Sequence, residues 1–358
     1  MIRMKYEFSR AAARFNPRRI IDLLGFKGLL KALEVKFLGA SASTYCYNFP
    51  DTVYLEITNR CQLRCKYCYR LHPDLMNPDQ GFMSYDDFVR SAEQIRGVRR
   101  LYLSMGGEPV LHRDIVRMLQ YVRDNRIART FGFVSNGMLI TPGVADDILR
   151  TKPHFIDISF DSPDAGVIES IRIGTDFETL TGNIRYLASH AAPETRIEIN
   201  TVITTDNLAS LERMPEFLHD LGVRCLRTQQ MMVRTGDAAE LRSAEPRELV
   251  NLLAEKCRRL GIEFHYDPML PKTVCMWPFR SVGITWDGKI SPCCYIETIG
   301  LNKEPFDFKG MWNGPEMRSW RRNMLTMEYP GICHKYCTFA HENNRTRIFA
   351  DKADERGF

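Results

Sequence analysis

Short strand-like runs and helical stretches alternate along this chain from residue 53 onward, and this alternation limits the possible folds most strongly. The strand-like runs, rich in β-branched and aromatic residues, are 53–58, 100–105, 130–135, 155–160, 196–203 and 225–230. Helix-length stretches such as 84–96, 112–125 and 176–190 separate them. Largely apolar strands spaced by helices are typical of βαβ units in a parallel sheet. The sequence predicts an α/β fold, and because six units are too few for a closed eight-fold barrel, a partial barrel or an open doubly wound sheet remains.

The pattern changes near residue 240. A helical stretch at 246–261 precedes "VGITWDGKIS" at 282–291, which predicts a hairpin that turns at Asp287-Gly288. Residues 311–337 predict a helix that ends at Pro330-Gly331 and is followed by a cysteine pair. We therefore predict three parts: a basic helical extension at 1–50, an α/β core at 51–240 and a small α+β domain at 241–358.

Composition excludes several classes of protein. The chain of 358 residues has no apolar run near the length of a membrane span, and its start lacks the continuous apolar segment of a secretory signal. Eleven cysteines are an odd number, which favours reduced thiols or metal ligands over a disulfide framework. We therefore expect a cytoplasmic protein.

The positive charge of the chain is concentrated at its start. Residues 1–50 hold nine Lys and Arg against three acidic residues, so the remainder is nearly neutral. A basic segment of this kind can contact nucleic acid or anionic lipid. A helix docked on the main domain is the favoured interpretation over contact with a membrane surface, and no nucleic-acid partner is expected.

Three cysteines, Cys61, Cys65 and Cys68, follow the first strand in the stretch "CQLRCKYC". This position is the carboxyl end of a strand, where α/β proteins place their active sites. Three thiolates are one too few for a closed zinc site, and thiolates suit iron–sulfur clusters equally well. A four-iron cluster on three cysteines keeps one iron open to another ligand. The triplet alone leaves both possibilities open.

The triplet occurs together with a second motif. Its CX3CX2C spacing has Tyr67 before the third cysteine, and the next strand ends in "SMGGEPVL" at 104–111. With both motifs in this order, the chain resembles the radical S-adenosylmethionine (radical SAM) superfamily. The resemblance implies a partial (β/α)6 TIM-like barrel and a [4Fe-4S] cluster whose open iron is chelated by S-adenosylmethionine. It also implies an external electron donor of the flavodoxin or ferredoxin type.

The resemblance assigns S-adenosylmethionine contacts to residues near several strand ends. They are Gly106, Gly107 and Glu108 for the methionine amino group, Tyr67 for the adenine, Ser159 and Arg172 for the ribose and carboxylate, and Asp161 at the same strand end. Three polar residues at further strand ends are cofactor contacts or simply turn and cap residues: Ser135, Asn136 and Asn200.

A second set of cysteines lies near the C-terminus. The spacing of Cys275, Gly288 and Cys293 resembles the opening of a SPASM/twitch domain, and Cys333 with Cys337 resembles its closing elements. A full SPASM domain carries seven cysteines and two auxiliary clusters, so this chain departs from the pattern. One auxiliary [4Fe-4S] cluster on these four cysteines is the favoured interpretation, and a structural zinc site is the alternative.

The other cysteines and the general base are less constrained. Cys46 and Cys257 are expected to pack in the core. Cys225 and Cys294 either pack there or donate a hydrogen atom to a substrate radical. The candidates for a general base are Glu198, His265 and Tyr295, and the sequence selects none of them.

The resemblance implies an oxidoreductase-type radical SAM enzyme, in which a 5′-deoxyadenosyl radical removes a substrate hydrogen atom. The favoured substrate is a small polyol, an aminocyclitol or sugar, oxidised at a carbinol carbon with the auxiliary cluster as electron acceptor. The alternative is a maturase or epimerase of a ribosomally made peptide. A non-enzymatic alternative is a nucleic-acid-binding module with zinc in both cysteine sites.

Overall fold

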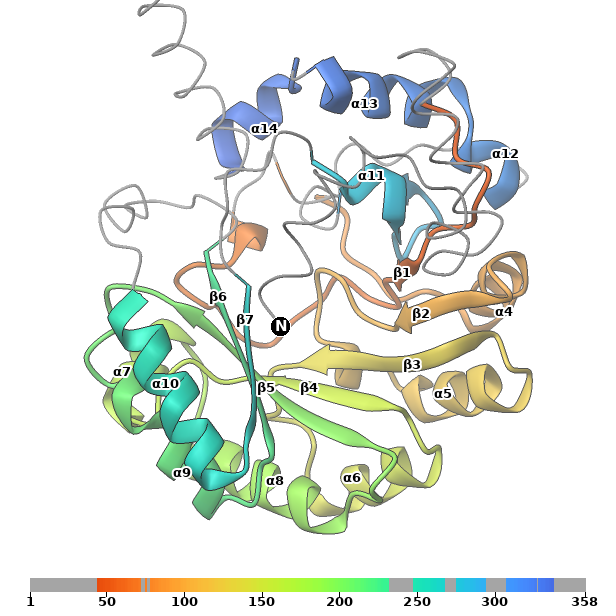
Figure 1. Cartoon of the computed structure of the whole chain (residues 1–358). Coiled ribbons are helices and arrows are strands. Elements are labelled where there is room, and N and C mark those ends of the chain that lie inside the picture. The colour runs from red at the N-terminus through yellow and green to blue at the C-terminus, as the bar shows by residue number, and fades with distance from the viewer. Residues whose placement is uncertain are drawn as a thin grey trace, which may run out of the picture.

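The computed structural model describes residues 44–71, 75, 78–231, 247–267, 275–293, 307–326 and 328–337. Most of the predicted extension at 1–50 lies outside these residues. The described part is built on a nine-stranded sheet in the order β7-β6-β5-β4-β3-β2-β1-β8-β9 (Figure 1). Neighbouring strands from β7 to β8 are parallel, and only the β8–β9 pair is antiparallel. The sheet does not close, so the prediction of a partial barrel is confirmed.

All six predicted strands are present. Their bounds are β1 Thr52–Leu55, β2 Val98–Tyr102, β3 Ala128–Ser135, β4 Phe155–Ser159, β5 Arg196–Ile203 and β6 Cys225–Gln230. Three more strands extend the sheet at its two edges: β7 Glu263–Asp267, β8 Ser281–Ile284 and β9 Ile290–Ser291. The sequence analysis missed β7 and the pairing of β8 with β1. The β8–β9 pair confirms the predicted hairpin, in which Gly288 adopts the positive φ of 80° that glycine tolerates best.

Helices follow most strands and cover one face of the sheet (Figure 1). The α-helices are α4 Tyr85–Gln94, α5 Ile115–Asp124, α6 Pro142–Arg150, α7 Ala165–Ile171, α8 Phe177–His190, α9 Met214–Asp220, α10 Arg247–Leu260, α11 Trp277–Arg280, α12 Phe308–Trp312, α13 Pro315–Thr326 and α14 Gly331–Tyr336. Short 3-10 turns occur at η1 Tyr69–Leu71, η2 Pro109–Leu111 and η3 Leu211–Arg213. The single helix predicted from residue 311 to Pro330-Gly331 is wrong: the stretch holds the end of α12 and then α13, which ends at Thr326. The next helix, α14, begins after Pro330, because proline suits the start of a helix better than its interior. No helix in these described ranges is long and apolar enough to cross a membrane.

Local sequence explains where several helices begin. The Ser84 hydroxyl accepts a hydrogen bond of 3.1 Å from the Asp87 N–H at the start of α4, and two aspartates lie in its first turn. The Asp176 carboxylate accepts one of 2.8 Å from the Thr179 N–H at the start of α8. These side chains satisfy backbone donors that lack a partner inside the helix.

Strand residues alternate between the helix-covered face and the opposite, concave face. On β4, Ile156 and Ile158 are fully buried in the same hydrophobic core as Ile184 and Leu187 of α8. Because side chains alternate along a strand, Phe155, Asp157 and Ser159 point to the concave face. This face therefore carries the polar residues of the central strands.

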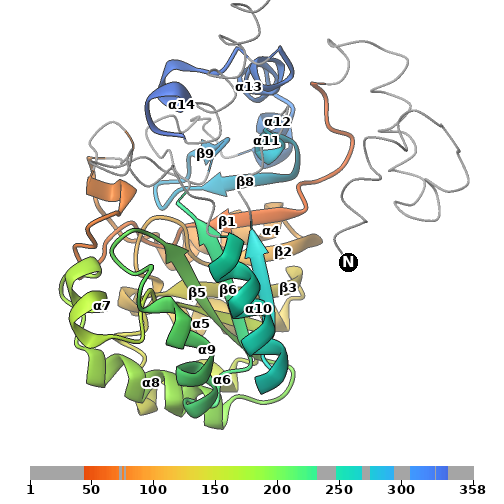
Figure 2. The same ribbon diagram turned by 60° about the vertical axis from the view of Figure 1, so that its left-hand side comes forward.

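The C-terminal helices gather at the end of the sheet beyond β1, around the β8–β9 hairpin (Figure 2). The fully buried Arg321 of α13 ties this region together: its guanidinium donates to the carbonyl oxygens of Pro278, at 2.9 Å, and Thr44, at 3.0 Å. The fully buried Glu56, just after β1, accepts from the Gly106 N–H at 2.9 Å and from the Trp286 N–H at 3.3 Å. One carboxylate thus joins the loop after β2 to the hairpin.

Candidate active site

The glycine–glycine–glutamate loop lies between the ends of β1 and β3. The Glu108 N–H donates to the Arg60 carbonyl oxygen at 2.7 Å, and Gly107 packs directly on the backbone of residues 58–60. A Cβ atom on Gly107 would lie 2.3 Å from the Thr58 carbonyl oxygen. Only glycine fits this backbone approach.

The Glu108 carboxylate organises the end of β3. It accepts hydrogen bonds from the Ser135 hydroxyl at 2.8 Å and from the Asn136 N–H at 2.7 Å, as well as from the Val110 N–H at 3.1 Å. Burial raises the pKa of the Glu108 carboxyl to about 7, although these donors oppose the rise. The sequence left open whether Ser135 and Asn136 contact the cofactor or act as turn residues. In the structure both bind Glu108.

The cysteine triplet lies on a loop that is held from two sides. The Arg64 and Lys66 N–H groups donate to the carbonyl oxygens of Ile173, at 2.9 Å, and Ile171, at 2.8 Å. The Asn136 side-chain amide donates to Cys61 Sγ at 3.7 Å. The Gln62 amide donates to the Asn136 side-chain oxygen at 3.1 Å, which fixes the direction of that contact. Asn136 therefore links the triplet loop to Glu108.

Arg172 and Asp161 form an ion pair beside the triplet, with 2.8 Å between Nε and Oδ2. Asp161 is also bound by the Val202 N–H at 2.9 Å. The charges of Asp161, Cys65 and Cys68 raise the pKa of Arg172 against the effect of burial, so the guanidinium lies within electrostatic reach of both cysteines. A fixed positive charge at this position favours thiolate ligands.

Tyr67, Ser159 and Asn200 occupy separate positions around this centre. The Tyr67 hydroxyl donates to Asp206 at 2.8 Å, and Lys66 forms an ion pair with the same carboxylate at 2.7 Å. Ser159 and Asn200 are register partners on β4 and β5. The structure thus brings Cys61, Glu108, Ser135 and Asn136 into one hydrogen-bonded group and places Tyr67 on the flank of the triplet loop.

The second cysteine site also assembles in the structure. Burial raises the pKa of the Cys333 thiol, and the charges of Cys275, Cys293 and Cys337 raise it further, so the four sulfurs lie within electrostatic reach of one another. They come from distant segments: the start of α11, the end of β9 and both ends of α14. Cys294 and Tyr295 lie outside the described residues.

The residues that follow the triplet in sequence pack against the four-cysteine site. Tyr69 directly follows Cys68, and Leu75 is fully buried. Leu75 packs with Tyr69, Cys293 and Cys333 in one small apolar cluster. Two cysteines of the second site therefore share an apolar cluster with the residue next to the triplet.

Both donor sets suit iron–sulfur clusters. The triplet offers three thiols from one loop beside a guanidinium, and the quartet offers four thiols that meet in a largely buried setting. Soft, clustered thiolates are the ligands that four-iron clusters take. Cys46 and Cys257 pack in the hydrophobic core, as expected, whereas the buried Cys225 lies outside that core and its thiol binds Glu198.

Sequence reasoning missed several residues of the site. Glu56 binds the Gly106 N–H, Asp206 binds Tyr67, and Gln62 orients Asn136. A carboxylate inside the apolar run "VYLEIT" was the available signal for Glu56. Asp206 and Gln62 give no such signal, because their roles depend on contacts between distant segments.

Asp157 is a second buried acid with a raised pKa. Its side chain points to the concave face, and burial together with the Glu198 charge raises its pKa to about 7. The other charged or titratable groups that act on it are Arg100 and Tyr102 of β2, Arg196 of β5 and Arg227 of β6. The arginines lower the pKa but do not cancel the effect of burial.

We expect Asp157→Asn to stabilise the protein at pH 8 and to have little effect at pH 4. The folded protein holds a proton on Asp157 up to about pH 7, whereas the unfolded chain releases it near pH 4. The stability that this proton provides is present below pH 4 and is lost as the pH rises to 7. Removing the charge should raise the free energy of unfolding at pH 8 by an amount of the order of 4 kcal/mol. Urea unfolding across this pH range measures it.

The control is Asp220→Asn, whose side chain is 82% exposed at the end of α9. It should change stability little at any pH. Equal effects of the two substitutions at pH 8 would contradict the raised pKa of Asp157.

Two family models of known proteins match the two regions that contain the cysteine sites. The family model of the radical SAM superfamily matches residues 55–218, and that of the SPASM iron–sulfur cluster-binding domain matches residues 275–338. Radical SAM domains bind a [4Fe-4S] cluster and S-adenosylmethionine, and SPASM domains bind auxiliary iron–sulfur clusters.

Two curated relatives and one solved structure are similar to this chain. The tungsten-containing aldehyde ferredoxin oxidoreductase cofactor-modifying protein of Pyrococcus furiosus is 26% identical, over 67% of this chain and 70% of that protein. The PqqA peptide cyclase of Ruegeria pomeroyi is 24% identical, over 73% of this chain and 72% of that protein. SuiB of Streptococcus suis, solved with its precursor peptide SuiA, has the same fold with a TM-score of 0.64 and 16% identity, over 83% of this chain and 72% of SuiB.

The two family models together cover more than half of the chain, in the order that the cysteine motifs indicate. The matched regions contain the triplet, the glycine–glycine–glutamate loop and the four cysteines of the second site, Cys275, Cys293, Cys333 and Cys337. The chain belongs to the radical SAM superfamily of enzymes and carries a C-terminal SPASM domain.

Proposed function

We propose that this enzyme uses radical chemistry to modify a peptide, with the triplet loop holding the catalytic cluster. The observation that carries the two-cluster part of the proposal is the packing of Tyr69, next to the triplet, and Leu75 with Cys293 and Cys333 of the four-cysteine site. A three-thiol site beside a four-thiol site provides one cluster with an open iron and one that is fully ligated. The two sites therefore suit different tasks.

Each set of residues has a task in this proposal. Cys61, Cys65 and Cys68 ligate the first cluster, and Cys275, Cys293, Cys333 and Cys337 ligate the auxiliary one. When bound, the cluster and S-adenosylmethionine supply a 5′-deoxyadenosyl radical that removes a hydrogen atom from the substrate. The protein contributes a largely buried site, with the Arg172–Asp161 ion pair beside the triplet, in which S-adenosylmethionine is held in one orientation.

The loop after β2 and the end of β4 hold S-adenosylmethionine. Gly106 and Gly107 bring the backbone close to its methionine part, and Glu108 faces the amino group. Arg172, oriented by Asp161, faces the methionine carboxylate. Ser135, Asn136, Ser159 and Asn200 line the edge formed by the carboxyl ends of β3, β4 and β5, and Tyr67 covers the adenine side. A flavodoxin- or ferredoxin-type protein is the electron donor.

A peptide substrate is better supported than the small polyol that the sequence analysis favoured. One relative is named for cyclisation of a peptide, and SuiB, which shares the fold, was solved with a precursor peptide. The Pyrococcus relative is named for modifying an enzyme cofactor, so the family serves several substrate classes. None of these three names a polyol as its substrate.

Co-expression tests the proposed substrate class. The enzyme is produced with each short open reading frame that neighbours its gene, and the peptides are analysed by mass spectrometry. We expect one peptide to lose two hydrogen atoms, or to exchange one when the reaction is run in deuterium oxide. Stoichiometric oxidation of an aminocyclitol, with every peptide unchanged, would contradict the proposal.

We expect Cys333→Ala to remove the auxiliary cluster and to leave the cluster of the triplet in place. Loss of one of four thiolates should lower the iron content from about eight to about four per chain. The triplet is unchanged, so 5′-deoxyadenosine formation with a chemical reductant should persist while the peptide product is lost. Iron analysis and chromatography of the nucleoside measure both effects. About two zinc ions in the parent protein, with no iron after anaerobic reconstitution, would contradict the cluster assignment.

A further inference from the structure

The concave face of the sheet carries a strip of aromatic rings. Tyr54 of β1 stacks on Tyr102 of β2 with their ring centroids 4.7 Å apart, and Trp277 lies 5.2 Å from Tyr54 on the other side. Tyr102 also lies 4.7 Å from Phe155 of β4. Gly132 of β3 lies between these two strands and has no side chain to separate the rings. The strip therefore crosses strands β1 to β4 and ends at Phe155, two residues before Asp157 on β4.

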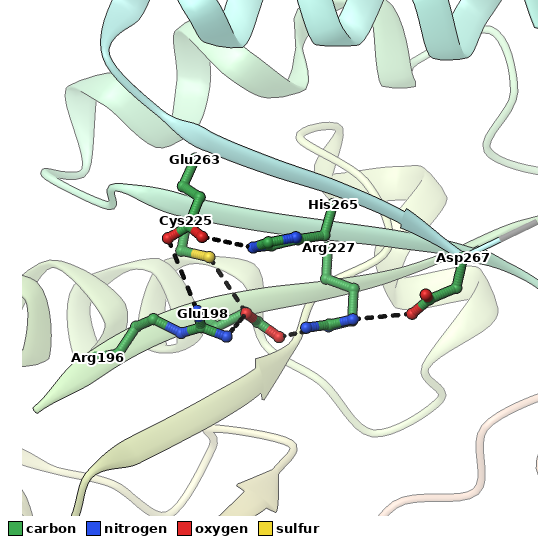
Figure 3. Close-up of polar contacts among 7 residues, drawn as sticks. All are labelled: Arg196, Glu198, Cys225, Arg227, Glu263, His265 and Asp267. Atoms are coloured by element: carbon green, nitrogen blue, oxygen red, sulfur yellow. Dashed lines mark hydrogen bonds and ion pairs between the residues drawn. The ribbon is translucent and has the colours of Figure 1, made fainter. Parts of the chain in front are cut away.

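A charged network lies beside the strip on β5, β6 and β7 (Figure 3). The Glu198 carboxylate, 1% exposed, binds the guanidinium groups of Arg196 and Arg227, the latter at 2.7 Å. The Cys225 thiol donates to Glu198 at 3.2 Å. Beyond it, Arg227 binds Asp267 at 2.8 Å and His265 binds Glu263 at 2.8 Å. Both oxygens of Glu198 are therefore bound by guanidinium groups. His265, the other general-base candidate within the described residues, is bound to Glu263.

A metal ion does not suit this network. Possible ligand atoms of Glu198, Cys225 and His265 lie within 4.8 Å of one another. Both oxygens of Glu198, however, are bound by guanidinium groups. Two fixed positive charges at the same carboxylate oppose a third cation there.

Asp157 differs from its neighbours because one of its oxygens has no partner. The residue is 5% exposed, and Oδ1 is buried without a hydrogen-bond donor among the described residues. Glu198, its register partner on β5, adds a second negative charge beside it. A buried carboxylate oxygen without a donor is unfavourable, so a ligand that provides a donor there would be favoured.

We propose that this face binds a cationic side chain, lysine or arginine, of the peptide substrate, with its charged end at Asp157 and its stem against Tyr102 and Phe155. The proposal rests on the proposed function and names the substrate class of that same site. A cationic group supplies the donor that Oδ1 of Asp157 lacks and pairs with this carboxylate. Aromatic rings attract a cation at about 6 Å or less and cover the apolar stem of a long side chain.

The placement relative to the cofactor edge agrees with this role. Asp157 lies two residues before Ser159 on β4, and Glu198 lies two residues before Asn200 on β5. Both acids are thus one layer deeper on the concave face than the strand-end residues assigned to S-adenosylmethionine. A side chain that reaches Asp157 places the peptide backbone toward that edge.

Peptide binding without reductant tests the proposal. The full-length, reconstituted protein with S-adenosylmethionine is titrated with acetyl-Gly-Gly-Lys-Gly-Gly-amide and with the equivalent norleucine peptide, which differs only in its charged end. Calorimetry at pH 8 should show at least tenfold tighter binding of the lysine peptide. The preference should shrink at pH 6, because Asp157 takes up a proton as the pH falls below about 7. It should vanish in Asp157→Asn and persist in the Asp220→Asn control.

Two results would overturn the inference: equal binding of the two peptides, including no binding of either, or a lysine preference that survives in Asp157→Asn. The proposed function is tested separately, by 5′-deoxyadenosine formation after reduction. Nucleoside formation without a lysine preference removes this inference alone. A lysine preference that Cys61→Ala retains while it loses nucleoside formation supports both.

Discussion

Cys61→Ala should reduce 5′-deoxyadenosine formation to background and lower the iron content from about eight to about four per chain. The triplet supplies three thiolates, and its geometry leaves no other cysteine of the described residues on the same loop. Removing Cys61 also removes the sulfur that the Asn136 amide contacts at 3.7 Å. The auxiliary site should keep its cluster, because its four cysteines lie in other segments. Anaerobic reconstitution, iron analysis and nucleoside chromatography measure the effect.

The matched control is Cys257→Ala. Cys257 is fully buried on α10, in the core behind the sheet, and burial raises the pKa of its thiol to about 12. Its loss should cost some stability through a small cavity but leave the iron content at about eight. If Cys61→Ala retained full nucleoside formation, the triplet would not hold the catalytic cluster.

The central strands were predictable because local pattern and tertiary role agree there. The runs at 196–203 and 225–230 match β5 and β6 residue for residue, and the first ends where the polar stretch 204–207 begins. The edge strands were not predictable in the same way. β7 reads "EFHYD", a short and polar run that pairs with β6 alone among the described strands. The β8–β1 pairing joins residues more than 200 positions apart, which no local pattern encodes.

The residues of the site also differ in how far the sequence predicts them. Motif spacing predicted Cys61, Cys65, Cys68 and the glycine–glycine–glutamate loop, because ligand number and close backbone approach require those residue types. The partners that hold them depend on tertiary contacts: Glu56 reaches Gly106, and Asp206 reaches Tyr67 from a loop about 140 residues away. Asp157 was visible as a charge within the apolar run "FIDISF". Its unpartnered oxygen became apparent only once β4 and β5 were in register.

Gly107→Ala should weaken S-adenosylmethionine binding at least tenfold and lower the free energy of unfolding by about 1–3 kcal/mol. The added Cβ would lie 2.3 Å from the Thr58 carbonyl oxygen and 2.6 Å from that of Arg60. Both atoms belong to the backbone, and Arg60 also accepts the Glu108 N–H, so the loop can relieve the overlap only by moving Glu108 away from the end of β3. Equilibrium dialysis with S-adenosylmethionine and urea unfolding measure the two effects.

The same substitution at Gly182 should have the opposite sign. Gly182 lies inside α8, and a Cβ there meets no atom within 4 Å, so alanine should stabilise the helix by about 0.5–1 kcal/mol and leave cofactor binding unchanged. The contrast separates a steric effect at the cofactor loop from a general effect of replacing glycine. If Gly107→Ala bound S-adenosylmethionine as tightly as the parent and unfolded at the same urea concentration, close backbone approach would not be what the motif provides. The role of the loop would then lie in Glu108 alone, whose carboxylate joins Ser135 and Asn136 whether or not residue 107 is glycine.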